Sequence, residues 1–380
     1  MPELNKKENI KKENLVLRVR GKEFQGWTAV TVQKSLYQMT GAFGLTSTDI
    51  FSKDFKKWNF SMGDECQVAI NNQILITGYI EDILISYDAK NHNIQIAGRD
   101  KPGDLIDCSF VESAKKWDNQ TIIKVIRDLC EPFNIDVEVD DSVSEQVSFK
   151  TPSKTFIVNE GETVFDSILR LSKASGILPV SYGNGKLVLT GTGTEKAYDH
   201  LELGKNIKSG SIDQTNRERF QTYIVRGQGK QQKGFFKSVE SIAQSKGEYL
   251  DELINRYRPL VILSDTGGEA QDFQNQSEWE CVTRAGKSRT IYYEVQGWTQ
   301  SNGKVWPLNA LVKIKDSFLG INEEWLIAAV NFSLNNDTGA MTELKIVRPD
   351  AFKLPLYNPT KEMKSVSDLD PLLDFQYHNL

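Results

Sequence analysis

The sequence has little of the chemistry from which metal and disulfide sites are built. Only three histidines and four cysteines occur among 380 residues, and no two cysteines form a CxxC pair. Structural zinc sites and disulfide frameworks need closely spaced ligands of these types, so the sequence predicts neither. We interpret the cysteines as reduced and mostly buried thiols, and we expect no metal and no cofactor. The cysteines are Cys66, Cys108, Cys130 and Cys281.

Motifs of hydrolytic and nucleophilic catalysis are missing as well. No HExxH, GxSxG or EF-hand sequence occurs, and the histidines fall in a predicted turn, a junction and the tail. Three carboxylates are grouped after a strand, where we expect them to cap backbone amides rather than share a proton. We predict no catalytic residue, although a glycosidase with two distant carboxylates would leave no local motif. The residues concerned are His92, His200 and His378, and Asp100, Asp104 and Asp107.

Long apolar runs and a strong charge of one sign are also absent. No run approaches the ~20 apolar residues that span a bilayer, and the N-terminal MPELNKKENIKKEN is charged where a secretory signal is apolar. We therefore expect the protein to be made and assembled in a cytoplasm. The net charge of −5 argues against a general nucleic-acid binder with a concentrated basic face, but it allows a wall past which nucleic acid slides.

The pattern of apolar residues predicts many short strands. Alternating apolar positions begin at LVLRVR, residues 15–20, and recur in short segments bounded by Gly, Asn or Asp. The clearest hairpin is at residues 76–100, where two alternating arms flank a polar turn. Strands this short and closely spaced indicate an antiparallel barrel or sandwich. We predict a flexible N-terminus at 1–14 and a first β-barrel domain at 15–100.

The hairpin at 76–100 has a counterpart near the C-terminus. Residues 326–350 can be laid over it without a gap, so that apolar positions coincide. Any two amphipathic hairpins can align in this way, so the match leaves both a true repeat and chance open. A true repeat would give two related β-barrel domains, one near each end. The coinciding pairs are Ile80 and Val330, Leu84 and Leu334, Ile94 and Leu344, Ile96 and Ile346, and Asp100 and Asp350.

The pattern becomes helical after the first hairpin. Apolar residues follow helical spacing beyond Asp118 and Asn119, either of which can cap the helix, and Pro132 ends it. A strand is expected at residues 133–139. We interpret residues 101–200 as a small α/β domain inserted after the first barrel.

A second helix is predicted after Gly161. Thr163 can cap it together with Asp166, and Gly176 stops it. The strand, turn and helix at 156–178 resemble the opening of a LysM module, which binds peptidoglycan. Any βα unit has this form, so scaffolding is the default interpretation and glycan binding the alternative.

Strand character returns in residues 201–350, which we predict to be a second β-barrel domain with an excursion at about 230–285. A helical turn is expected near residues 249–254, a helix at 269–285, and an extended tail at 351–380 that docks onto a neighbour. The fold class is then mainly β with α+β character: two related antiparallel barrels and an inserted α/β domain. Tryptophans near turns either form a sugar-binding platform or, as we expect, pack in the core: Trp298, Trp306 and Trp325.

Several motifs occur in an order typical of one family. GRDKPGDLIDCS at 98–109, with GKEFQGWTAVTVQKSL upstream at 21–36, resembles the baseplate hub proteins of Mu-like contractile-tailed phages, the family of Mu P-like and late control D-like tail proteins. The resemblance covers about residues 15–352. Further matches follow in the same order: GETVFDSILRLSKASGILP at 161–179, YIVRGQG at 223–229, RYRPLVI at 256–262, and GW at 297–298 with KVWPLNALVKI at 304–314.

The resemblance implies a structural function without catalysis. Hubs of this family are trimers in which two barrels per subunit form a pseudo-six-fold ring, matching a six-fold tail tube to a three-fold spike. We accordingly expect a homotrimer in the tail baseplate of a phage or prophage virion, with the tube or tube-initiator protein, the spike and other baseplate proteins as partners. DNA is expected to pass through its axial channel without sequence-specific binding, and no membrane insertion is expected. The alternatives are a peptidoglycan-binding or peptidoglycan-degrading tail component and a monomeric adhesion module.

Overall fold

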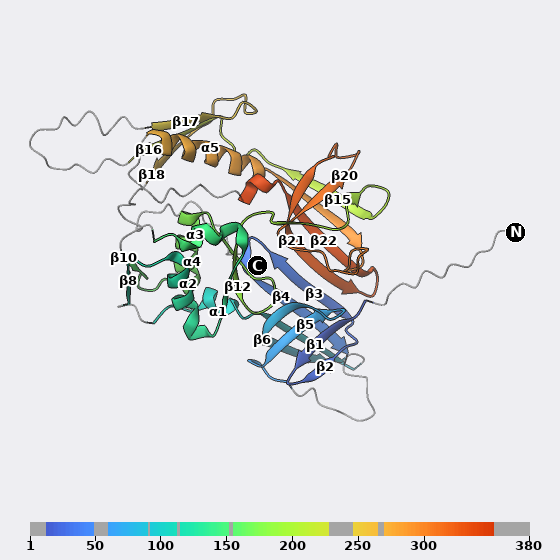
Figure 1. Ribbon diagram of the computed structural model, residues 1–380. Coiled ribbons are helices and arrows are strands. Elements are labelled where there is room, and N and C mark those ends of the chain that lie inside the picture. The colour runs from blue at the N-terminus through green and yellow to red at the C-terminus, as the bar shows by residue number, and fades with distance from the viewer. Residues whose placement is uncertain are drawn as a thin grey trace, which may run out of the picture.

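The computed structural model describes residues 13–48, 60–89, 92–111, 115–151, 155–227, 246–264 and 270–352. This part of the chain is mainly β, with antiparallel sheets and a smaller helical share (Figure 1). None of its helices is long and apolar enough to cross a membrane. The predictions for the first twelve residues, for the polar stretch at 230–245 and for the tail beyond Phe352 lie outside the described residues.

Seven strands of the N-terminal hundred residues form what we term the first strand group. Their order in the sheet is β3-β4-β7-β6-β5-β1-β2, and all neighbours are antiparallel. Buried and exposed side chains alternate as the sequence predicts, for example in β3, where Val30 and Val32 face the core. The strands are β1 Leu15–Val19, β2 Lys22–Phe24, β3 Ala29–Ser35, β4 Gln38–Thr48, β5 Glu65–Ile70, β6 Gln73–Tyr87 and β7 His92–Asp100.

A second strand group lies in the C-terminal half of the chain. Its order is β15-β19-β22-β21-β20, with β13 and β14 parallel to β20 at the far side. The strands are β13 Glu195–Lys196, β14 Leu201–Glu202, β15 Ile207–Gln214, β19 Arg289–Gln296, β20 Ala310–Lys315, β21 Glu324–Asn335 and β22 Gly339–Val347.

The two strand groups are joined by β21 and β3, which pair antiparallel. This pairing makes one 14-stranded sheet, and both groups contribute to one continuous hydrophobic core. The hydrogen-bonded path runs from β15 to β2 without returning to its start in the described part of the chain. The sheet that these described strands form is therefore open.

The two groups share their strand order. In chain order, β3, β4, β5, β6 and β7 correspond to β15, β19, β20, β21 and β22, and corresponding strands have corresponding neighbours. Both hairpins also contain a β-bulge, between Ile80 and Asp82 in β6 and between Ile327 and Ala329 in β21. A bulge fixes the register of a hairpin, so it is the natural reference for aligning the two.

The ungapped sequence alignment of the two hairpins has the wrong register. Aligned on the bulges, Ile80 corresponds to Ile327 and not to Val330. The turns differ in length, because Tyr87 pairs with His92 across the first and Asn335 with Gly339 across the second. No ungapped alignment can therefore match both arms.

The middle region, between the two groups, has its own core and lies to one side of the sheet (Figure 1, green). Helices α2 and α4 pack together there beside a three-stranded sheet, β11-β12-β9, and a β8-β10 pair. The elements are α1 Gly103–Asp107, β8 Lys116–Asp118, α2 Ile122–Cys130, β9 Val137–Val139, α3 Ser144–Ser148, β10 Thr155–Ile157, α4 Val164–Ser175, β11 Leu178–Val180 and β12 Leu187–Thr190, with 3-10 turns at Glu131–Phe133 and Asp141–Val143.

Helix α4 begins and ends as predicted. The Thr163 hydroxyl accepts from the backbone N–H of Asp166, whose carboxylate accepts from the backbone N–H of Thr163, which completes a capping box. Gly176 ends the helix with a φ of 71°. The strand, turn and helix at 156–178 exist, and the apolar face of α4 packs into the core of the middle region.

The predicted cap of α2 is wrong. The helix begins after Thr121, whose side chain makes no capping hydrogen bond. Asp118 is unsuited because it belongs to β8 and accepts a hydrogen bond from Thr155 of β10. Asn119 has a φ of 54° and turns the chain between that strand and the helix.

The strand expected at 133–139 is shorter than predicted. Pro132 lies in a 3-10 turn, and Asn134 adopts a left-handed φ of 52°, so extended backbone starts only at Val137. These local turns are invisible to a pattern of alternating apolar residues, which continues through them.

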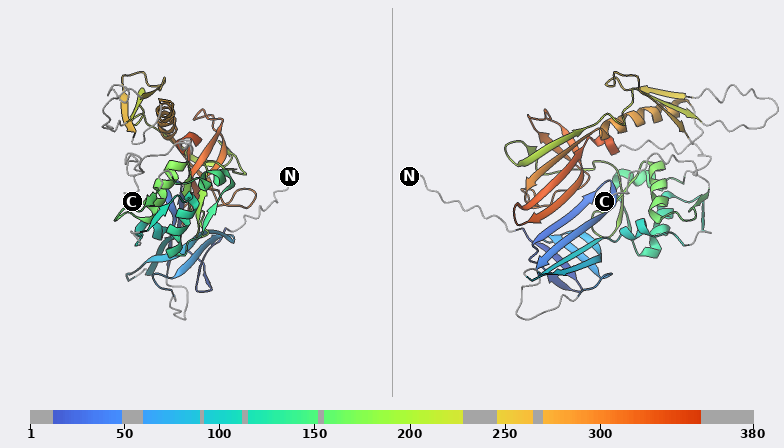
Figure 2. Two further views of the ribbon diagram at one scale, coloured as in Figure 1. Left: turned by 60° about the vertical axis from the view of Figure 1, so that its left-hand side comes forward. Right: turned by 180° about the vertical axis from the view of Figure 1, so that it is seen from behind.

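An insert separates β15 from β19 (Figure 2). Its strands are β16 Thr222–Gly227, β17 Lys246–Leu250 and β18 Pro259–Ser264, in the order β17-β16-β18, and α5 Ala270–Lys287 packs against β16 and β17. The helix expected at 269–285 is confirmed. The prediction of a helical turn near 249–254 is wrong for its first residues, because Tyr249 pairs with Tyr223 in the sheet. A 3-10 turn, Pro349–Phe352, follows β22 and contacts α5.

Candidate functional site

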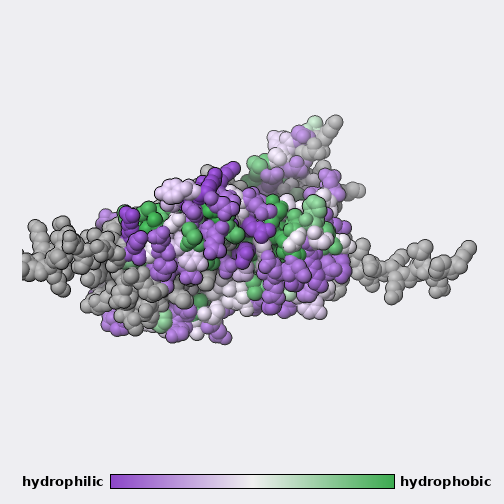
Figure 3. All heavy atoms as spheres, turned by 90° about the horizontal axis from the view of Figure 1, so that it is seen from above, coloured by the Kyte–Doolittle hydropathy of each residue, from purple (hydrophilic) through white to green (hydrophobic). Residues whose placement is uncertain are grey.

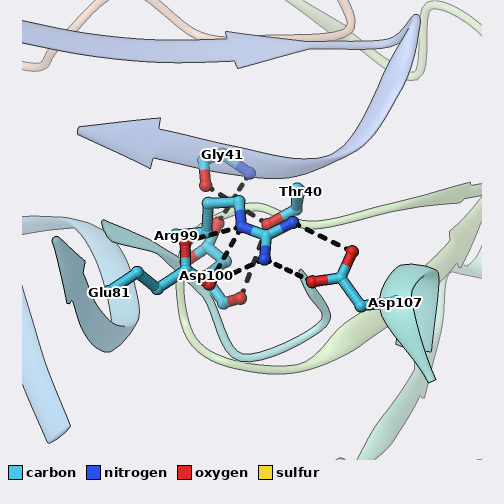
Figure 4. Close-up of polar contacts among 6 residues, drawn as sticks. All are labelled: Thr40, Gly41, Glu81, Arg99, Asp100 and Asp107. Atoms are coloured by element: carbon cyan, nitrogen blue, oxygen red, sulfur yellow. Dashed lines mark hydrogen bonds and ion pairs between the residues drawn. The ribbon is translucent and has the colours of Figure 1, made fainter. Parts of the chain in front are cut away.

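Two of the grouped carboxylates, Asp100 and Asp107, lie where the first strand group meets the middle region (Figure 4). β7 ends at Asp100, whose buried carboxylate accepts from the backbone amides of Gly41 in β4 and Thr77 in β6, at 3.2 and 3.0 Å. It also accepts from the Ser181 hydroxyl of the middle region at 3.1 Å. Asp100 therefore caps backbone amides, as predicted, and in addition holds the two regions together.

A half-buried lysine lies near this carboxylate. Lys34 of β3 donates from Nζ to the carbonyl oxygen of Tyr182 at 2.7 Å, which is a second bond between the strand group and the middle region. Burial lowers the pKa of Lys34 to about 8, while the charge of Asp100 opposes this change. Burial likewise raises the pKa of Asp100 to about 6, against Lys34 and the hydrogen bonds just described. Each group offsets part of the cost of burying the other.

A carboxyl group with a pKa near neutrality suits general acid–base catalysis, but Asp100 is not placed for it. Such catalysis requires the carboxyl group to come within hydrogen-bond reach of a substrate. Only 1% of Asp100 is exposed, and its oxygens are occupied by two amides and a hydroxyl. The arrangement is that of a structural joint.

The preceding residue, Arg99, connects the same strand to α1 (Figure 4). Its guanidinium donates to both carboxylate oxygens of Glu81, with Nε at 3.0 and 2.8 Å, and also to Asp107. Hydrogen bonds to these two carboxylates raise the pKa of Arg99. Glu81 lies in the β6 bulge and Asp107 ends α1. The bulge therefore presents a side chain that helps to position the middle region.

Among the described residues, no hydrogen bond joins the remaining carboxylate, Asp104, to Asp100 or Asp107. Burial makes the largest contribution to raising the pKa of Asp104, and the charge of Glu81 raises it further. The charge of Arg99 acts in the opposite direction. Asp107 pairs with Arg99 instead of capping an amide, so the prediction of amide capping holds for Asp100 alone.

The histidines and cysteines that the structure describes are not brought together. His92 begins β7 next to the Tyr87 ring, His200 is exposed before β14, and His378 lies outside the described residues. Three cysteines are buried and one, Cys108, is exposed; all four are free. In the part of the chain that the structure covers, no group of His, Cys, Asp or Glu could hold a metal ion.

The tryptophans singled out in the sequence are core residues. Trp298, Trp306 and Trp325 are all buried in the core that the two strand groups share. The surface seen from above is mostly hydrophilic, with separate hydrophobic patches (Figure 3). These three rings therefore form no sugar-binding platform.

The central strands β21, β3, β4 and β7 present a polar surface on the side away from the core. Its side chains are exposed or half-buried, small or uncharged, and alternate with core residues such as Val32 and Phe332. We call this surface the open face. It consists of Asn331, Ser333, Thr31, Gln33, Gly44, Thr46, Gln95 and Ala97. Sequence alternation indicates such a face, but only the β21–β3 pairing shows that it extends across both strand groups.

Three stretches of the chain match described protein families. Residues 14–100 match the N-terminal domain described as Mu phage baseplate assembly protein GpP-like. Residues 102–191 match the second domain of baseplate hub protein gp44-like proteins, and residues 269–355 the fourth domain of Mu phage baseplate assembly protein GpP.

Individual proteins are similar over nearly the whole chain. The baseplate hub protein gp44 of Escherichia phage Mu is 33% identical over 369 residues, which is 96% of each chain. The 43 kDa tail protein of prophage MuSo2 from Shewanella oneidensis is 34% identical with a TM-score of 0.78, covering 90% of this chain and 100% of that one. A tail protein from Neisseria meningitidis MC58 shares the fold, at 20% identity and a TM-score of 0.75, with 89% and 99% covered.

Proposed function

The chain belongs to the family of Mu-like phage baseplate hub proteins, and from this premise we propose that it forms a ring-shaped homotrimer that joins the six-fold tail tube to the three-fold spike. Other baseplate proteins assemble around this ring, and the parts come together in the host cytoplasm. The observation that carries the proposal is the shared strand order of the two strand groups.

Two similar strand groups let three chains imitate six-fold symmetry. Closed rings with head-to-tail contacts repeat one interface around an axis. A chain with two such groups contributes two similar segments to the ring, so that a trimer offers six positions to the tube and three to the spike. We propose accordingly that residues 15–100 and 201–350 are related barrel-type domains and that residues 101–200 form the inserted domain.

The open face suits the wall of an axial passage for DNA. Lys and Arg side chains that neutralise phosphates supply most non-specific affinity for DNA. The eight residues of the open face include neither, and Arg99, the next residue on this side of β7, is paired with Glu81 and Asp107. A duplex would therefore move along the open face without being retained. No sequence-specific contact is needed for this role.

A non-enzymatic role agrees with the joint at Asp100. Its two titratable groups, the buried Asp100 and the half-buried Lys34, are hydrogen-bonded across two regions and hold the middle region in place. We propose that the protein acts mechanically and that no residue is catalytic.

The solution mass tests this function. Light scattering after size exclusion, with negative-stain images of the same peak, is expected to give three chain masses and particles with a central hole. A strict monomer at every concentration would contradict the ring. Retention on cell-wall sacculi would favour the peptidoglycan-binding alternative instead.

A further inference from the structure

The joint between the two strand groups shows how one group pairs with another. Residues Ala329–Leu334 of β21 pair antiparallel with Val30–Ser35 of β3, and Phe332 lies opposite Val32. Both side chains are fully buried. An exposed strand edge of each group is thereby removed.

Each half of this joint has a counterpart in the other strand group. Alignment on the bulges places Asp82–Tyr87 of β6 on Ala329–Leu334 of β21. Paired residues can be traced from β7 through β4 to β3 in the first group. They can be traced in the same way from β22 through β19 to β15 in the second group. By this tracing, Val30–Gln33 of β3 are the counterparts of Gly210–Asp213 of β15.

These two counterpart edges have no strand beside them. β6 pairs with β5 only from Gln73 to Tyr79, and β15 pairs with β19 alone. Within the residues that the structure covers, no strand is hydrogen-bonded to the second edge of 82–87 or of β15. The two edges lie at opposite ends of an eight-strand path, β15-β19-β22-β21-β3-β4-β7-β6 (Figure 1).

The uncovered part of β6 carries three exposed apolar or aromatic side chains. Leu84, Ile85 and Tyr87 are 57%, 67% and 81% exposed, whereas Phe332, the counterpart of Ile85, is 0% exposed. A long apolar strand edge in water is a ready template for pairing with another chain. Phe332 is buried because β3 lies beside it, and Ile85 is exposed because no described strand lies beside it.

We propose that residues 82–87 of one copy pair with β15 of the next copy, antiparallel and in the register of the joint within the chain. Ile85 then lies opposite Ile212, Ser86 opposite Ser211, and Tyr87 opposite Gly210. The proposal rests on the ring proposed above and identifies the surface that closes it. The occupant of the β6 edge is a second copy, because the matching half of the joint exists on this same chain.

The core-facing side chains of the two edges fit this register. Ile212 is half-buried and packs on the shared core, so Ile85 would extend that core across the interface. Gly210 has no side chain, and a Cβ there would approach the Tyr293 ring at 2.8 Å. An aromatic side chain opposite a strand glycine covers the exposed backbone, which is the position that Tyr87 takes.

Site-specific cross-linking tests this interface. Ile85→Cys and Ile212→Cys, introduced into a Cys108→Ser background and treated with a short bismaleimide, are expected to shift the denatured protein from one to three chain masses. Coexpressed single variants, Ile85→Cys with Ile212→Cys, are expected to give a two-chain product, which proves that the link joins different copies. The matched control replaces Ile212→Cys by Leu263→Cys, a β18 site of 56% exposure, and is expected to stay at one chain mass.

The outcomes separate this inference from the proposed function. A trimeric solution mass without cross-linked product, or with equal product from the Leu263→Cys control, would overturn the strand pairing and leave the ring standing. A monomeric mass at every concentration would overturn both. A trimeric mass with the three-chain product in the Ile85→Cys and Ile212→Cys protein alone would establish both.

Discussion

The hairpins β6–β7 and β21–β22 share a strand order and a bulge, but differ in what lies beside them. The outer half of β21 is covered by β3, while the outer half of β6 has no strand beside it in the described part of the chain. Counterpart side chains are accordingly buried in one hairpin and exposed in the other, as Phe332 and Ile85 show. The difference indicates that one chain holds one complete joint and two halves of another.

The largest effect is expected at the completed joint. Phe332→Ala removes a fully buried aromatic side chain and should lower the free energy of unfolding by about 3–5 kcal/mol. Ile85→Ala is the matched control, and should change that free energy in the monomer by no more than about 0.5 kcal/mol. Urea unfolding of both variants under conditions that keep the protein monomeric measures the contrast. Equal losses would contradict the assignment of Ile85 to an uncovered edge.

The next largest effect is expected at the ends of β7 and β22, where each hairpin contacts a neighbouring part of the chain. Asp100→Ala leaves the amides of Gly41 and Thr77 without their acceptor and Lys34 without its counter-charge, at a cost of about 3 kcal/mol. On the bulge alignment its counterpart is Arg348, which makes only an exposed pair with Asp350 at 3.5 Å. Arg348→Ala should therefore cost less than about 1 kcal/mol.

Denaturant unfolding with a probe in the middle region checks this pair of variants. Asp100→Ala is expected to loosen that region ahead of the sheet, because the carboxylate joins the two. If Arg348→Ala lowered the free energy of unfolding as much as Asp100→Ala, the two positions would be equally important to the fold, which would contradict this prediction.

A smaller effect is expected from pH. Burial raises the pKa of Asp100 from 3.8 to about 6, so the folded state binds this proton more tightly than the unfolded state does. The resulting stabilisation is present at low pH and is lost as pH rises through about 6. Asp100→Asn does not titrate, so stability measured at intervals between pH 4 and pH 7 should shift in favour of this variant, relative to the wild type, as pH rises. A difference that stays constant or moves the other way would contradict the burial of a charged Asp100.

The smallest effect on the monomer, and the largest on assembly, is expected at the uncovered edge. Ile85→Asp places a charge on an exposed strand and should leave the free energy of unfolding of the monomer within about 0.5 kcal/mol. The same charge would be buried against Ile212 of the next copy, so the solution mass should fall from trimer to monomer. Leu263→Asp, on an exposed strand of the insert, should leave the trimer intact.

Local features of this fold could be predicted from the sequence, and long-range features could not. The capping box of α4 and the alternation in β3 depend on residues within a few positions of one another, and both are confirmed. The pairing of β21 with β3 joins residues about 300 positions apart. The registers of the two hairpins depend on bulges and turn lengths that a pattern of apolar residues does not reveal, which is why the ungapped alignment has the wrong register.

The candidate site shows the same limit. Asp100 could be expected to accept backbone amides, because it ends a strand in a turn-rich segment. Its bond to Ser181 and the nearby Lys34 come from other parts of the chain, and no spacing in the sequence connects the three.

Hydrogen exchange of the assembled protein tests the central claim most directly, because the completed joint is an internal standard. In the trimer peak, peptides covering residues 82–87 and 209–214 should be protected to the same degree as those covering 329–334 and 30–35. Dilution to monomer should expose the first two and leave the last two protected. Fast exchange of 82–87 and 209–214 within an intact trimer would contradict the account.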